Sequence, residues 1–234
     1  IYVDENPTLY PARPVQVRIH LENPDVPDAL LGATIARAKE ICAESEQLCR
    51  IYTRCEPDDD ALLARLAPFG FKDNDGLIRM QLRLERSFKA PAGCAVVYDA
   101  LDDPQEQKYF LERYNRLFNT EHDLAWLKEY IDRRDFVRIL TVAPTGMAGE
   151  VLVWREGYSG VIGFIQTAKR WRRLGVASYM LALACDRFEQ QNLYCAEANI
   201  RARFPHMLKL MGRVGFEQSE LLMRYPGSDI NPGQ

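Results

Sequence analysis

Apolar residues recur along this chain with two periods, one typical of helices and the other of strands. Over the first part of the chain the periods alternate, and they predict strands at 15–22, 48–52 and 78–84 with helices at 25–41 and 58–68 between them. The second helix has N-capping residues at Asp58–Asp60 and is ended by Pro68 and Gly70. This part therefore predicts the order strand, helix, strand, helix, strand.

The second part of the chain begins after Lys89–Gly93, a segment with a proline that we interpret as a linker. Its pattern predicts strand, helix, helix, strand, strand, strand, helix, strand, helix and strand. The first six are a strand at 95–99, a helix opened by Asp103-Pro104, a helix at 124–131, and strands at 136–143, 150–155 and 161–167. Hairpins mixed with parallel crossovers predict an α+β fold, with a mixed, mainly antiparallel sheet flanked by helices.

The two parts align with each other at one constant offset and without a gap. Phe69-Gly70-Phe71 falls on Val214-Gly215-Phe216, and Leu77 falls on Leu222. The same offset lays Val15–Glu22 over Gly160–Thr167, two runs that both read as strands. We interpret the first part as a partial copy of the second.

Composition narrows the class of protein. Hydrophobic residues make up 47% of the chain and charged residues 27%, as in an ordinary globular protein. The net charge of −3 gives no overall positive field for nucleic acid or anionic lipid, and no apolar run reaches the length of about 18 residues that a membrane span needs. The six cysteines include no C-x-x-C pair and only three histidines accompany them, so we expect no metal site, reduced thiols and a cytoplasmic protein.

The stretch that carries chemistry follows the strand at 161–167, where Lys169-Arg170-Trp171-Arg172-Arg173-Leu174-Gly175-Val176-Ala177-Ser178 leads into an apolar helix. A loop that enters a helix leaves backbone N–H groups unpaired at the positive end of the helix dipole, which favours an anion such as a diphosphate. Gly175 permits a tight backbone, Ala177 keeps the approach open, and the basic side chains add positive charge. A solvated basic turn is the alternative interpretation.

Arg172-Arg173-Leu174-Gly175-Val176-Ala177 resembles the Q/R-x-x-G-x-G/A acyl-CoA signature of the GNAT N-acyltransferases, with Trp171 in place of the aromatic residue that often precedes it. The order of elements over about 94–226 is similar to that family as well, and about 14–84 resembles a partial second copy. The resemblance implies a degenerate GNAT-like half-domain at 1–88, a linker at 89–93 and a GNAT acyltransferase domain at 94–234.

The resemblance also implies that acetyl-CoA binds in a cleft between the strand at 161–167 and the strand near Tyr194. The pantetheine arm would pair with the backbone of Ile165, Gln166 and Thr167. The diphosphate would rest on Arg172, Arg173, Leu174, Gly175, Val176, Ala177 and Ser178. The aligned loop of the first copy holds Glu22, Asp25 and Asp28 and no arginine, so we expect no CoA there.

The proton carriers of catalysis remain open at this point. Many GNAT enzymes have a tyrosine four residues before the late glycine, where this chain has Met211. Glu197 and His206 are candidate proton carriers by position. The alternatives are a solvated carboxylate at a strand end for Glu197, and a helix-capping or surface residue for His206.

Three functions are compatible with these residues. In the first, the protein is an N-acyltransferase that moves an acetyl or related acyl group from acetyl-CoA to a small-molecule or peptide amine by direct attack in a ternary complex, as a monomer or homodimer. In the second, suggested by Met211, it is a catalytically silent CoA-binding or regulatory module. The third, nucleic-acid binding through the arginine-rich turn, is disfavoured by the negative net charge.

Overall fold

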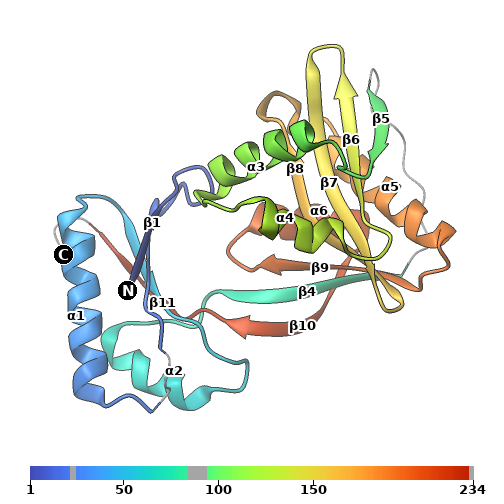
Figure 1. Ribbon diagram of the computed structural model, residues 1–234. Coiled ribbons are helices and arrows are strands. Elements are labelled where there is room, and N and C mark those ends of the chain that lie inside the picture. The colour runs from blue at the N-terminus through green and yellow to red at the C-terminus, as the bar shows by residue number, and fades with distance from the viewer. Residues whose placement is uncertain (22–24, 84–93, 232–234) are drawn as a thin grey trace.

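The computed structural model describes residues 1–21, 25–83 and 94–231 of the chain (Figure 1). The predicted linker at 89–93 lies outside the described residues, as do Glu22 of the predicted acidic loop and Leu84 at the end of a predicted strand. Within those residues the chain forms a four-stranded and a seven-stranded sheet, each with its own helices.

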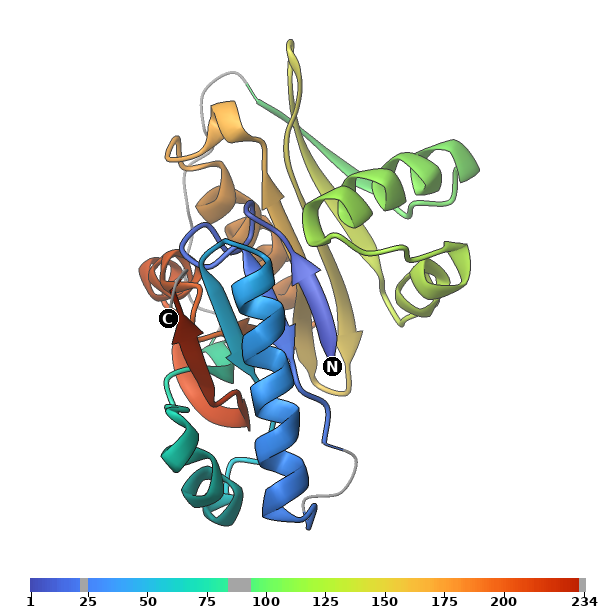
Figure 2. The ribbon, with the colours of Figure 1, turned by 90° about the vertical axis from the view of Figure 1, so that its left-hand side faces the viewer.

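The four-stranded sheet, in the order β1-β2-β3-β11, is the centre of an N-terminal unit. Its strands are β1 (Tyr2–Glu5), β2 (Val15–Arg18), β3 (Cys49–Tyr52) and β11 (Gly227–Ile230). Helix α1 (Asp28–Glu44) joins the parallel strands β2 and β3 and covers one face of the sheet (Figure 2). Helix α2 (Asp60–Leu66) and the 3-10 turn η1 (Ala67–Phe69) follow β3.

The seven-stranded sheet has the order β10-β4-β9-β8-β7-β6-β5. Its strands are β4 (Gly76–Arg83), β5 (Ala95–Asp99), β6 (Val137–Ala143), β7 (Gly146–Glu156), β8 (Ser159–Thr167), β9 (Cys195–Arg201) and β10 (Glu217–Arg224). Every neighbouring pair is antiparallel except β8 with β9. The predicted α+β fold with a mixed, mainly antiparallel sheet is therefore confirmed.

Helices cover both faces of the seven-stranded sheet (Figure 1). Helices α5 (Val176–Gln190) and α6 (Pro205–Val214) bury Met180, Leu181 and Phe188 among other apolar residues on one face. On the other face, α3 (Pro104–Phe118) and α4 (Leu124–Ile131) bury Phe110 and Leu127. The chain after β8 passes through a second 3-10 turn, η2 (Lys169–Trp171), before α5 begins.

The two units exchange strands. Strand β4 comes from the part of the chain before the predicted linker, yet it lies between β9 and β10 of the seven-stranded sheet. In return β11, from the C-terminal part, pairs antiparallel with β3. The predicted division into 1–88 and 94–234 thus cuts through both sheets. Each sheet contains one strand from the other part of the chain.

Candidate acyl-CoA site

Strands β8 and β9 run parallel and then separate. They pair only at Ser159–Val161 with Cys195–Glu197, and beyond Val161 strand β8 pairs with β7 alone. The far half of β9 pairs with β4 alone. The sheet is therefore open between these two strands, on the side where β8 leads into the arginine-rich loop.

A β-bulge lies at the point where the strands separate. The register of β7 with β8 shifts between Leu152↔Phe164 and Val153↔Ile162, which leaves Gly163 as the additional residue. A Cβ at Gly163 would lie 1.8 Å from the ring of Trp154, so only glycine fits there. Gly163 inside the predicted strand at 161–167, with Gly160 directly before it, is a sequence signal for such a bulge.

The N-terminal unit has no such opening. There β2 and β3 pair along their full lengths, and Ile19 N donates a further hydrogen bond of 2.8 Å to Tyr52 O beyond the last pair. The strands that align with β8 and β9 are therefore closed along their described lengths.

The loop after β8 ends at Gly175, which caps α5 in the left-handed conformation at φ 84° without any side-chain cap. Arg173, two residues earlier, is also left-handed at φ 65°. The first intrahelical bond is donated by Tyr179 N to Gly175 O, so the N–H groups of Val176, Ala177 and Ser178 precede it and have no helical partner. Val176 itself is buried at 1% exposure and anchors this turn to the core.

The charge around this turn is positive and unpaired. Among the described residues no carboxylate lies within ion-pair distance of Lys169, Arg170, Arg172 or Arg173. Arg172 and Arg173 are exposed, and Arg172 Nε donates to Thr167 O at 3.4 Å. With the helix dipole behind it, the turn has the electrostatics of an anion site.

The predicted pantetheine segment forms the end of β8 beside this turn. Ile165, Gln166 and Thr167 are half-buried and pair with β7 on one side. The side-chain oxygen of Gln166 is buried and has no hydrogen-bond partner in the described part of the chain. Leu174, by contrast, projects from the loop and is 58% exposed.

Glu197, the first candidate proton carrier, is the last residue of β9 that pairs with β8. Its carboxylate accepts hydrogen bonds from Ser159 Oγ at 2.7 Å and from Gln81 Nε2 at 3.0 Å, and Arg79 Nε lies 3.8 Å away. Glu197 is thus fixed in a polar network at the base of the opening rather than solvated at a strand end.

His206, the second candidate, lies in the first turn of α6 and near the arginine-rich loop. Partial burial and the nearby charge of Arg172 lower its pKa below the ordinary value. The neutral imidazole is therefore favoured near pH 7. His206 contacts the ring of Phe204, and within the described part of the chain no hydrogen bond or ion pair joins it to Glu197.

Met211 occupies the position where a GNAT tyrosine is often found, and it is 1% exposed in the core under α6. Its side chain is buried in the core cluster together with residues of α5, β8 and β9.

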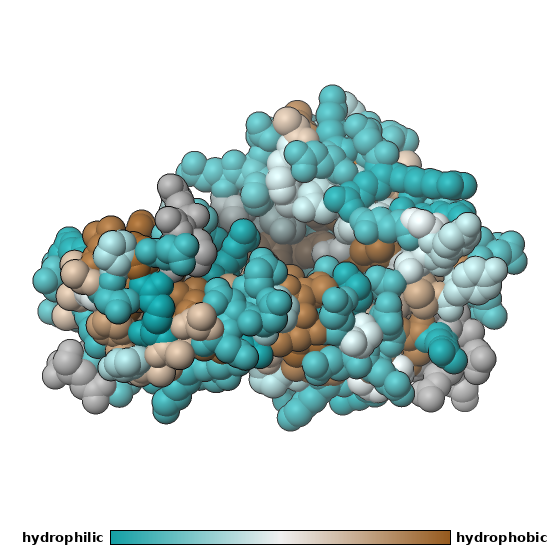
Figure 3. Space-filling model, turned by 90° about the horizontal axis from the view of Figure 1, so that it is seen from below, coloured by the Kyte–Doolittle hydropathy of each residue, from teal (hydrophilic) through white to brown (hydrophobic). Residues whose placement is uncertain are grey.

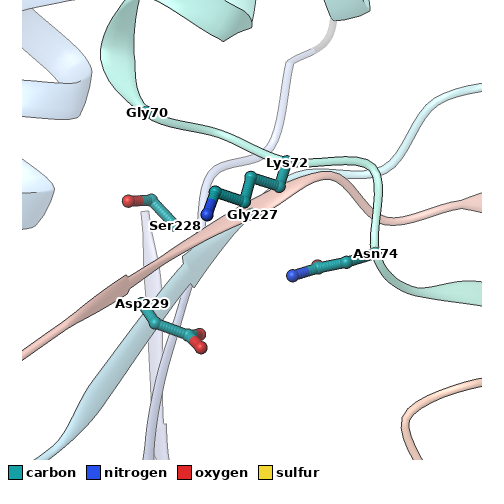
Figure 4. Close-up of a pocket in the computed structure, with 6 residues that line it drawn as sticks. All are labelled: Gly70, Lys72, Asn74, Gly227, Ser228 and Asp229. Carbon is teal, nitrogen blue, oxygen red and sulfur yellow. The ribbon is translucent and has the colours of Figure 1, made fainter.

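A cavity of about 270 Å³ lies at the edge strand β11 (Figure 4). It is lined by Gly70, Lys72, Asn74, Gly227, Ser228 and Asp229. None of the predicted site residues takes part in it.

The described residues meet neither the requirements of a metal site nor those of a membrane-spanning helix. They contain no group of three or more His, Cys, Asp or Glu side chains placed to hold a metal ion. None of their helices has the length and hydropathy to cross a bilayer.

Solved structures share this fold. A GCN5-related N-acetyltransferase from Sphaerobacter thermophilus superposes with a TM-score of 0.58 at 15% identity, over 99% of this chain and 76% of that one. A tandem GNAT protein from the clavulanic acid biosynthesis pathway gives a TM-score of 0.53 at 15% identity, over 87% and 70%. A Drosophila protein gives 0.50 at 14% identity, over 94% and 72%.

No protein-family profile and no curated protein sequence matches the chain. At such low identities the likeness defines the fold alone. The fold is that of the GNAT N-acetyltransferases, in an arrangement of two units.

Proposed function

We propose that the protein is an N-acyltransferase that uses acetyl-CoA or a related acyl-CoA and an amine acceptor. The observation that carries this proposal is the opening between β8 and β9, which leads directly to an unpaired, positively charged helix N-terminus. The diphosphate of CoA would bind at Arg172–Ser178, and the pantetheine arm along Ile165–Thr167.

In this reaction the acceptor nitrogen attacks the thioester carbonyl carbon, the C–S bond breaks, and CoA leaves as a thiolate that takes up a proton. The acceptor amine must lose a proton, and Glu197 or His206 would receive it. Glu197 is supported by its place at the base of the opening, and His206 by its lowered pKa. The acceptor would be a small molecule or a peptide, and we expect a cytoplasmic monomer or homodimer.

The test is the loss of thioester absorbance when acetyl-CoA is mixed with a panel of amines, amino acids and peptides. We expect turnover with at least one acceptor, and a fall of about 10²-fold or more in kcat for Glu197→Gln or His206→Gln, whichever residue is the base. Glu217→Gln, on the exposed start of β10, is the matched control and should leave kcat unchanged.

A catalytically silent CoA-binding module is the second candidate, and the burial of Met211 favours it. Both candidates require CoA binding, so binding does not separate them. Tight acetyl-CoA binding with no thioester loss for any acceptor would favour the silent module and contradict the enzyme.

A further inference from the structure

Two arginines at the end of β9 contact the N-terminal unit. Arg201 forms an ion pair with Asp75, and Arg203 Nε lies 4.0 Å from the same carboxylate. Asp75 also accepts a hydrogen bond of 3.1 Å from Arg203 N and is only 1% exposed at its side chain. The single buried carboxylate of Asp75 therefore interacts with two guanidinium groups.

Two more arginines approach from the N-terminal unit itself. Arg50, whose side chain is 5% exposed, lies 3.1 Å from Asp229, and Arg13 lies 3.7 Å from the other oxygen of that carboxylate. The Nε atoms of both arginines are buried and have no hydrogen-bond partner among the described residues. Asp229 and Asn74, which accepts from Arg50 at 2.7 Å, also line the cavity of Figure 4.

Where the two units meet, the guanidinium groups of these four arginines contact two carboxylates of the described residues, Asp75 and Asp229. We call this cluster the junction. Positive charge that is removed from water without a partner is costly, and an anion bound nearby offsets that cost. Burial and the charge of Arg50 lower the pKa of Arg203, whereas the contact with Asp75 raises the pKa of Arg201 against the effect of its burial. The unfavourable charge therefore falls mainly on Arg203.

The guanidinium groups of Arg201 and Arg203 are held in place and still have free donors. Arg201 stacks on the ring of Tyr225 at 3.6 Å, and Arg203 lies over the ring of Tyr10 at 4.8 Å. Arg203 Nη1 donates to Gln16 Oε1 at 2.6 Å. Arg201 Nη1 and Arg203 Nη2 have no hydrogen-bond partner in the described part of the chain, and neither atom is sealed from solvent.

This cluster lies along the same strand as the opening. Glu197, Asn199 and Arg201 alternate with core residues on β9 and so share the face opposite α5. At about 3.3 Å per residue, Arg201 is about 7 Å from Asn199 and about 13 Å from Glu197 along the strand. Seen from below, the mainly hydrophilic surface is hollowed near its middle, with hydrophobic side chains in the recess (Figure 3).

We propose that Arg201 and Arg203 bind a carboxylate of the acceptor, so that the acceptor is an amine that also carries a carboxylate. The free Nη atom of each arginine could donate to one oxygen of a carboxylate, and the surplus charge of the junction would be neutralised on binding. The distance along β9 places this carboxylate several bonds from the reacting amine. The inference rests on the proposed function, because it assigns the acceptor end of the same opening.

The test is calorimetric titration of the CoA-saturated protein with glycine, 4-aminobutanoate and 6-aminohexanoate, each compared with its own carboxamide. We expect at least one of the longer carboxylates to bind about tenfold or more tightly than its carboxamide. Arg203→Gln should remove this preference and Arg203→Lys should restore part of it. Arg37→Gln, an exposed arginine of α1 paired with Glu40, is the matched control and should keep the preference intact.

Equal binding of carboxylate and carboxamide at every length, or no binding at all, overturns the inference. So does a preference that survives in Arg203→Gln and in Arg201→Gln. A variant that only loses stability, with its preference retained, would show a structural role. Acetyl-CoA is titrated first, and a failure to bind it would contradict the proposed function itself. Normal acetyl-CoA binding without a preference for carboxylates would contradict only the acceptor assignment.

Discussion

Gly149 on β7 offers a way to disturb the CoA site without replacing any residue that would contact CoA. A Cβ at this position would lie 2.7 Å from Met180 Cε in α5 and 2.8 Å from the backbone oxygen of Gln166 in β8. The methionine side chain can move, but the Gln166 carbonyl cannot move without shifting the strand. We predict that Gly149→Ala displaces the end of β8 and the first turns of α5 relative to β7.

The expected cost of this overpacking is about 1–3 kcal/mol in the free energy of unfolding. In a chain of this size each kcal/mol corresponds to about 2–4 °C in Tm. Gly212→Ala is the matched control, because Gly212 lies in α6 and a Cβ there meets nothing within 4 Å. That change should instead stabilise the protein by about 0.5–1 kcal/mol through helix propensity.

Urea unfolding measures both free energies, and calorimetry measures acetyl-CoA affinity in the same variants. Gly149→Ala should lose stability and affinity together, whereas Gly212→Ala should keep its affinity. Adding Met180→Leu to Gly149→Ala should recover only part of the loss, since the contact with Gln166 O remains. Wild-type stability for Gly149→Ala, or shifts of the same sign for both glycines, would refute this reasoning.

Three further predictions follow from the packing. Met211→Tyr should destabilise the core by about 1–3 kcal/mol without raising turnover, and a gain in thioester loss would contradict the inward direction of this side chain. Deleting residues 1–88 removes β4 from between β9 and β10 and leaves β11 without β3, so the fragment should aggregate; a soluble fragment that binds acetyl-CoA would be inconsistent with the exchange. The pKa of His206 should lie below its ordinary 6.5, so this histidine lowers the free energy of unfolding as pH falls below that value. Acetyl-CoA should raise the pKa of His206, because the diphosphate offsets the charge of Arg172. An NMR titration, with His206→Gln for assignment, measures this shift, and no change on adding acetyl-CoA would mean that the diphosphate binds elsewhere.

The sequence predicted the order of most elements and the bounds of some. The helix at 124–131 and the strand at 95–99 have the same bounds in the structure. Strands β1 and β11 were not predicted, because half or more of their residues are acidic, glycine or serine, which are uncommon in strands. The exchange of β4 and β11 was not predicted either, since the repeat suggested that each copy would complete its own sheet.

The candidate site also has one part that a local sequence indicates and another part that it does not. The turn that ends at Gly175 depends on a local sequence, and its glycine is left-handed in the structure. The binding of CoA there stays a prediction. The arginine cluster is a product of tertiary structure. Asp75 and Arg201 are 126 residues apart, so only the strand exchange, which places β4 beside β9, brings them together. No local pattern could have indicated that contact.

Acetyl-CoA affinity of the double variant Arg172→Glu with Gly175→Trp tests the central claim most directly. The control is Arg134→Glu with Gly157→Trp, which makes the same charge change and replaces another left-handed glycine that has open space, at the opposite end of β8. We predict that wild type and control bind acetyl-CoA with the same affinity, and that the loop variant stays folded and loses binding. Equal affinity of all three proteins would contradict a CoA site at this loop.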